Sequence, residues 1–112
     1  MRRIARALRY SFKGLASAAR GEPAFLQELI VCAFLIPVAV WLGEDAIERA
    51  LMIGSLLLIL IVELVNTAIE TVVDRIGPER DELSGRAKDL GSAAVFVSLV
   101  LAAVVWGFAL LG

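Results

Sequence analysis

The stretch LMIGSLLLILIVELVNTAIETVVDRIG, residues 51–77, is the part of the chain on which its fold depends most. It begins as a run that is apolar apart from Ser55 and then places three acidic residues and an asparagine among the apolar ones. These four stand at i, i+3, i+7 and i+11, along one side of a helix: Glu63, Asn66, Glu70 and Asp74. At 1.5 Å per residue they form a polar stripe about 16 Å long. The stretch therefore predicts a membrane-spanning helix with one polar side.

The composition of the whole chain agrees with a membrane protein. Of its 112 residues, 60% are hydrophobic and none is histidine, and the mean hydropathy is +0.85. These values lie outside the range of ordinary soluble domains. The length gives room for about three spans of ~20 residues and none for a separate soluble catalytic domain. The single cysteine, Cys32, supports neither a disulfide framework nor a zinc site.

The apolar pattern predicts a single all-α membrane domain over residues 1–112. Its transmembrane helices are expected at 24–42, 50–73 and 90–111, and Pro37 should either kink the first of these or be accommodated by it. Residues 1–21 contain six basic residues and no acidic one. On a helix, Arg2, Arg6, Arg9 and Lys13 form one stripe, and Ile4, Leu8, Phe12 and Leu15 gather on the other side. This segment is predicted to be an amphipathic helix on the membrane surface.

The distribution of lysine and arginine predicts how the chain is oriented. Six basic residues precede the first span, one lies between the first and second, four lie in the connection 74–89, and none follows the third. The positive-inside rule then puts the N-terminus and the 74–89 connection in the cytoplasm. The 43–49 link and the C-terminus are expected outside. The polar stripe consequently faces the cytoplasmic leaflet.

A carboxylate at membrane depth is costly unless it is paired, protonated or hydrated, so the stripe marks a functional site. Interhelical hydrogen bonds would explain Asn66 alone but explain two glutamates less easily. A cluster of carboxylate oxygens without histidine or cysteine suits Mg²⁺. Glu22 and Glu28 could supply further oxygen ligands, and Arg86 and Lys88 could bind phosphate. The chain has no Walker loop and no protein-kinase signature. The residues alone indicate an enzyme or an ion-coupled transporter.

Two ungapped motifs carry a family resemblance. Residues 63–75 read E-x-x-N-x-x-x-E-x-x-x-D-R, and residues 82–95 read E-L-S-G-R-A-K-D-x-G-S-A-A-V. Together with RYSFKGL (9–15) and EPAFLQE (22–28), they resemble the prokaryotic diacylglycerol kinases over almost the whole chain. Pro23 and Pro37 are not features that the family pattern explains, and Pro23, beside Glu22, could alter how Glu22 is presented.

The resemblance implies a homotrimeric kinase of the bacterial inner membrane with active sites shared between neighbouring subunits. It would use MgATP to phosphorylate diacylglycerol, giving phosphatidic acid and ADP for phospholipid biosynthesis, with no nucleic acid partner. Glu63 would be the general base, with Asn66 beside it, and Glu22 and Glu70 would hold the Mg²⁺. The resemblance assigns the nucleotide site to Arg3, Tyr10, Glu22, Glu70, Glu79, Asp81, Lys88 and Asp89. It assigns the lipid site to Ala24, Phe25, Leu26, Gln27, Glu28, Arg49, Glu63 and Ser92.

Three other interpretations stay open on the sequence. The same site could serve a kinase of undecaprenol, because the acceptor cannot be deduced from residue chemistry. A small proton-coupled transporter has about this length, but it should have four spans where the pattern predicts three. A structural membrane subunit would tolerate Glu63→Gln and Glu70→Gln.

Overall fold

The computed structural model of this chain describes residues 2–77 and 81–112, and the fold is all-α, as predicted. Its helices are α1 (Arg2–Gly21), α2 (Pro23–Leu42), α3 (Ala46–Ile76) and α4 (Glu82–Leu111). In the described residues, α2, α3 and α4 are long and apolar enough to cross a membrane. The prediction of three spans is confirmed in number. Helices α3 and α4 extend past the predicted apolar segments at their charged ends, because polar residues continue a helix into water.

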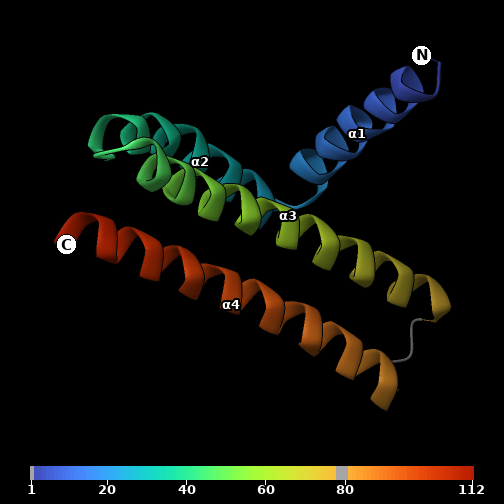
Figure 1. Ribbon diagram of the computed structural model, residues 1–112. Helices are drawn as coiled ribbons and strands as arrows, with labels where there is room; N and C mark the ends of the chain where they lie inside the picture. The colour runs from blue at the N-terminus through green and yellow to red at the C-terminus, as the bar shows by residue number, and fades with distance from the viewer. Residues whose placement is uncertain (1, 78–80) are drawn as a thin grey trace.

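Helix α3 is the central element of the bundle (Figure 1). It runs antiparallel to both of its neighbours and packs more extensively on α4 than on α2. The C-terminus lies at the same end as the α2–α3 link, whereas α1 leaves the bundle from the start of α2. The C-terminal half of α3, which carries the polar stripe, therefore extends past α2 and lies near the C-terminal end of α1.

Pro23 produces the change of direction between α1 and α2. A proline ring disfavours helical backbone at the preceding residue, and Glu22 is extended, with φ −123° and ψ 101°. The Glu22 N–H still donates to the Ala18 carbonyl at 2.9 Å, and the Glu22 carbonyl accepts from the Leu26 N–H at 3.1 Å. One residue thus ends the first helix and begins the second. Further along, α2 continues through Pro37, which is exposed.

The core of the single chain is small. Phe25 and Met52 are its largest fully buried side chains. The Trp106 indole N–H donates to the Met52 carbonyl at 3.2 Å and so joins α4 to α3. By contrast, large apolar side chains are exposed along every span, Phe34, Trp41 and Phe108 among them. Apolar surface on this scale belongs against lipid or other chains, because water would disfavour it.

Helix α3 approaches α4 closely at Gly91. A Cβ atom built on Gly91 would overlap Asn66 Oδ1 and lie 3.2 Å from Asn66 Cγ. Gly91 is itself buried. Small residues at a helix interface allow such contacts within membranes. Gly91 therefore makes room for the Asn66 amide against the backbone of α4.

We expect Gly91→Ala to displace the Asn66 side chain and to lower the free energy of unfolding by roughly 1 kcal/mol. Gly107→Ala is the matched control on the same helix, because nothing lies within 4 Å of the position that its added methyl group would take. That control should be neutral or slightly stabilising, since alanine favours helix over glycine. Unfolding by sodium dodecyl sulfate in detergent micelles, followed by circular dichroism, compares the two. Equal effects would contradict the close packing at Gly91.

Candidate active site

The polar stripe of α3 passes from the interior of the bundle to its surface. Glu63, Asn66 and Glu70 are half-buried, whereas Asp74 is exposed. One helix carries all four, so their spacing along the stripe follows from the 1.5 Å rise per residue. Of the four residues in the stripe, Glu63 lies furthest from the α3–α4 connection. The end of the stripe at Asp74 meets the α3–α4 connection.

The carboxyl group of Glu63 lies against that of Glu28, which α2 contributes. One Glu28 oxygen, Oε2, is buried without a hydrogen-bond donor, and the same holds for Oδ1 of Asn66. In residues 2–77 and 81–112 these are the two buried side-chain oxygen or nitrogen atoms that lack a partner. Buried polar atoms are nearly always hydrogen-bonded in folded proteins. A donor group from outside the chain would satisfy them, and Glu63 neighbours both residues.

Glu22 lies where α1, α2 and α3 meet. It occupies the N-cap position of α2, yet its side chain makes no capping hydrogen bond. It lines a hollow of about 570 Å³ together with Thr67 and Thr71 of α3. Glu70 precedes Thr71 directly and lies one turn from Thr67. The fold thus brings Glu22 to the part of α3 that carries Glu70.

A metal ion would have few protein ligands in this single chain. The described residues contain no group of three or more His, Cys, Asp or Glu side chains suited to hold an ion. Mg²⁺ is commonly bound by one or two carboxylates, with waters and substrate phosphates completing its octahedron. The pair Glu22 and Glu70 has the oxygen chemistry for such a site.

The predicted nucleotide residues come from two separate parts of the chain. Arg3 and Tyr10 are exposed on α1, whereas Asp81, Lys88 and Asp89 lie at the start of α4. Within the described parts of the chain, no hydrogen bond or ion pair joins Arg3 or Tyr10 to α4. Glu79 lies outside the described residues.

Two of these residues have structural partners that the sequence pattern does not indicate. Lys88 Nζ and Asp74 Oδ1 form an ion pair at 2.6 Å between α4 and α3. The Lys88 side chain is 30% exposed and that of Asp74 is 66% exposed, so water weakens the pair. Asp81 is the N-cap of α4 and accepts from the Ser84 N–H at 2.7 Å. This backbone hydrogen bond, helped by the Ser84 hydroxyl, lowers the pKa of Asp81.

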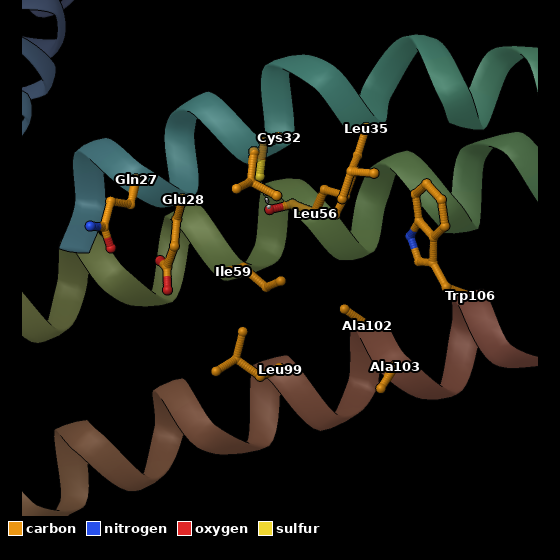
Figure 2. A pocket seen from close by; sticks show the side chains of 11 residues that line it. Gln27, Glu28, Cys32, Leu35, Leu56, Ile59, Leu99, Ala102, Ala103 and Trp106 are labelled. Atoms are coloured by element: carbon orange, nitrogen blue, oxygen red, sulfur yellow. Dashed lines mark hydrogen bonds between the residues drawn. The ribbon is translucent and has the colours of Figure 1, made fainter.

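An apolar cavity of about 490 Å³ lies between α2, α3 and α4. Figure 2 shows Gln27 and Glu28 at one end of it and the Trp106 ring at the other. Leu56, Leu99 and Ala102 line the part between them. The cavity exists only because three helices pack together, so no single stretch of sequence indicates it. Among its lining residues, sequence reasoning singles out Gln27 and Glu28 alone as functional.

The predicted lipid residues are spread over more of the molecule than this cavity. Phe25 is fully enclosed within the chain, Ala24 and Leu26 are exposed on α2, and Ser92 is exposed beside Gly91. Arg49 lies at the other end of the bundle, where its Nε donates to the Val40 carbonyl at 3.0 Å. It stands 14 residues from Glu63, about 21 Å along α3. The structure therefore brings Glu28 against Glu63, with Gln27 beside Glu28 in the cavity lining, and leaves Arg49 apart.

Comparison with known proteins identifies clear relatives. The family described as "Prokaryotic diacylglycerol kinase" matches residues 9–110. The chain is 56% identical to a diacylglycerol kinase of Haemophilus influenzae, over 88% of this chain and 84% of that protein. It is 52% identical to one of Escherichia coli K12, over 93% and 85% of the two chains. A diacylglycerol kinase of Helicobacter pylori is 40% identical over 95% and 83%. Of the candidate site residues, only Arg3 lies outside the range 9–110.

The Asp81 cap makes a prediction about the start of α4. Asp81→Ala should speed amide hydrogen exchange in the first turn of α4, and Asp81→Ser should not, because serine caps about as well as aspartate. The lowered pKa means that the carboxylate's contribution is complete above its ordinary value of 3.8. It is lost as the pH falls through the lower folded-state pKa.

Hydrogen exchange followed by mass spectrometry tests this expectation, and equal exchange in both variants would contradict the capping role. The same pair separates capping from nucleotide binding. A higher KM for ATP in Asp81→Ser, with normal exchange, would assign Asp81 a contact with the nucleotide as well.

Proposed function

Because this chain belongs to the prokaryotic diacylglycerol kinase family, we propose that it transfers the γ-phosphoryl group of MgATP to the free hydroxyl of diacylglycerol. The products are phosphatidic acid and ADP. Family membership makes the chain a lipid kinase of the membrane, and its three apolar helices agree with that location.

One observation carries the choice of Glu63 as the reaction centre. The two buried acceptor atoms without a donor, Glu28 Oε2 and Asn66 Oδ1, belong to residues that neighbour Glu63. A lipid hydroxyl is a hydrogen-bond donor that remains at membrane depth. Binding it here would satisfy an otherwise unpaired oxygen and place its proton beside the Glu63 carboxylate.

The chemical step then needs one proton transfer and one phosphoryl transfer. Glu63 accepts the proton of the lipid hydroxyl while the hydroxyl oxygen forms a bond to the γ-phosphorus. The bond from the γ-phosphorus to the bridging oxygen of ADP breaks, and ADP leaves with that electron pair. Asn66 holds the acceptor side of the site against α4 by its contact at Gly91. Catalysis by positioning of this kind is typical of phosphoryl transfer.

Glu22 and Glu70 are the proposed ligands of the Mg²⁺ that accompanies ATP. The uncapped carboxylate of Glu22, which lines the hollow between α1 and α3, supports this assignment. A bound Mg²⁺ supplies positive charge to the phosphate oxygens. Further contacts to the nucleotide are proposed for Arg3, Tyr10, Glu79, Asp81, Lys88 and Asp89. For Lys88 this requires exchange of its Asp74 partner for phosphate.

The lipid is proposed to approach Glu63 along α2. Gln27 and Glu28 line the apolar cavity, Glu28 lies against Glu63, and Ala24, Phe25 and Leu26 precede them on the same helix. Ser92 lies beside the Asn66 contact on α4. Arg49 is kept as a proposed lipid contact at the far end of the bundle, where it would meet the distal part of a long acyl chain or a second lipid.

We place the site at the cytoplasmic face of the bacterial inner membrane. The excess of basic residues before α2 and between α3 and α4 supports this orientation. A homotrimer is part of the proposal, because half-buried Glu63 and Glu70 would be covered further by a neighbouring subunit. Undecaprenol remains the alternative acceptor, since its terminal hydroxyl could donate to the same oxygens.

Glu63→Gln should reduce phosphoryl transfer by about 10²–10⁴-fold, the usual contribution of a general base. The amide keeps the shape of the side chain but cannot take the proton. The measurement is transfer of labelled γ-phosphate from MgATP in mixed micelles, with diacylglycerol and undecaprenol as parallel acceptors.

The matched control is Glu44→Gln, which makes the same change at an exposed position in the α2–α3 link and should retain the parent rate. Near-normal turnover by folded Glu63→Gln would refute its role as base. A preference for undecaprenol would keep the site and replace the proposed acceptor.

Glu22→Gln and Glu70→Gln should each raise the Mg²⁺ concentration needed for half-maximal rate, by about tenfold or more, because each removes a charged oxygen ligand. Titration of Mg²⁺ at fixed ATP measures this shift. Curves that coincide with that of the parent protein would exclude these two residues as ligands.

A further inference from the structure

Helix α1 carries a cluster of positive charge that the proposed reaction does not use. Arg2, Arg6 and Arg9 line a hollow of about 380 Å³ together with Ala5. All three arginines are exposed. They stand at i, i+4 and i+7, so their side chains project from one side of the helix.

These guanidinium groups have no partner within the described parts of the chain. Over the ranges 2–77 and 81–112, none of the three forms an ion pair or a side-chain hydrogen bond. Helix α1 contains no acidic residue at all. Three unpaired arginines on successive turns repel one another, and an anion between them relieves this repulsion. A planar guanidinium also binds phosphate oxygens in pairs.

The opposite side of α1 indicates which kind of anion binds these arginines. Ile4, Leu8 and Phe12 are 61%, 55% and 68% exposed, so the protein itself leaves this apolar side uncovered. A helix with such a side lies in the interface of a bilayer, with its basic residues at the level of the headgroups. The anions present at that level in high concentration are lipid phosphates.

We propose that Arg2, Arg6 and Arg9 form a binding site for the headgroup of an anionic phospholipid that is not the substrate. The occupant carries a phosphodiester, as phosphatidylglycerol does, and its acyl chains lie beside the apolar side of α1. This contact fixes α1 on the membrane surface next to the hollow that Glu22 and Thr67 line. The lipid is thus a structural ligand of the surface helix.

The test measures lipid binding and needs no turnover. The full chain is placed in nanodiscs of phosphatidylcholine with a graded fraction of phosphatidylglycerol, and the lipids retained on release are counted by native mass spectrometry. The parent protein should retain phosphatidylglycerol in preference to phosphatidylcholine. In the double variant Arg6→Gln, Arg9→Gln this preference should fall by about thirtyfold, since each basic residue near an anionic surface contributes on the order of 1 kcal/mol.

A second double variant removes the same charge outside the hollow. Arg20 and Arg75 are exposed, at the last turn of α1 and of α3. Arg20 stands 11 residues from Arg9, about 16 Å along α1, which is beyond the Debye length of roughly 8–10 Å. Salt therefore screens its effect on a headgroup bound in the hollow, and Arg20→Gln, Arg75→Gln should stay within about twofold of the parent. Circular dichroism confirms that both doubles keep their helices. Equal losses in the two doubles would overturn the proposal, because they would show general attraction to negative charge. Displacement of phosphatidylglycerol by MgADP would overturn it too, because the arginines would then belong to the nucleotide site. Both results are independent of which lipid the enzyme phosphorylates.

Discussion

A polar group inside a membrane must find its partner within the protein or in a ligand, because hydrocarbon offers none. This constraint organises α3 and everything packed around it. Ser55 meets it alone, by donating to the Met52 carbonyl of its own helix at 2.8 Å. Glu63 meets it by lying against Glu28 of α2. Asn66 reaches α4 only because Gly91 has no side chain. Two oxygens, on Glu28 and Asn66, are left without donors. By the same constraint, they are where a donor group of the substrate would bind.

The polar stripe of α3 runs along one helix from the hydrocarbon of the membrane to water. At the inner end of the stripe, Glu63 lies against Glu28, which lines the cavity of Figure 2. The outer end carries exposed Asp74 and the connection to α4. A reaction between a lipid hydroxyl and a water-soluble phosphoryl donor needs such a passage. The bend at Glu22 and Pro23 adds the third side of the site, because it turns α1 away from the bundle and leaves Glu22 at the hollow beside Thr67 and Thr71. Thus Pro23 produces the bend that leaves Glu22 where the proposed metal site requires it.

Much of the fold follows from local sequence. The number of spans, the amphipathic α1 and the single polar side of α3 depend on hydropathy and helical periodicity, which are properties of neighbouring residues. Helix ends are less predictable: α4 begins at Glu82 instead of residue 90, because the Asp81 cap and a charged but helix-forming segment continue the helix outside the apolar run. The ion pair of Lys88 with Asp74 is likewise hidden from local patterns. Its two residues stand 14 positions apart on either side of a connection, and each has a ready functional interpretation of its own.

Three properties of this chain need no knowledge of its packing: that it is a membrane protein of three spans, that its carboxylates gather on one side of one helix, and to which family it belongs. They depend only on the helical repeat, the cost of charge in hydrocarbon and ungapped motifs. Other properties exist only in the packed fold: Glu28 faces Glu63, Gly91 admits Asn66, Glu22 meets the Thr67 side of α3, and Arg49 lies far from all of them. Such contacts depend on how three helices cross and rotate about their axes. Those angles arise from packing between distant segments, which no local stretch of residues contains.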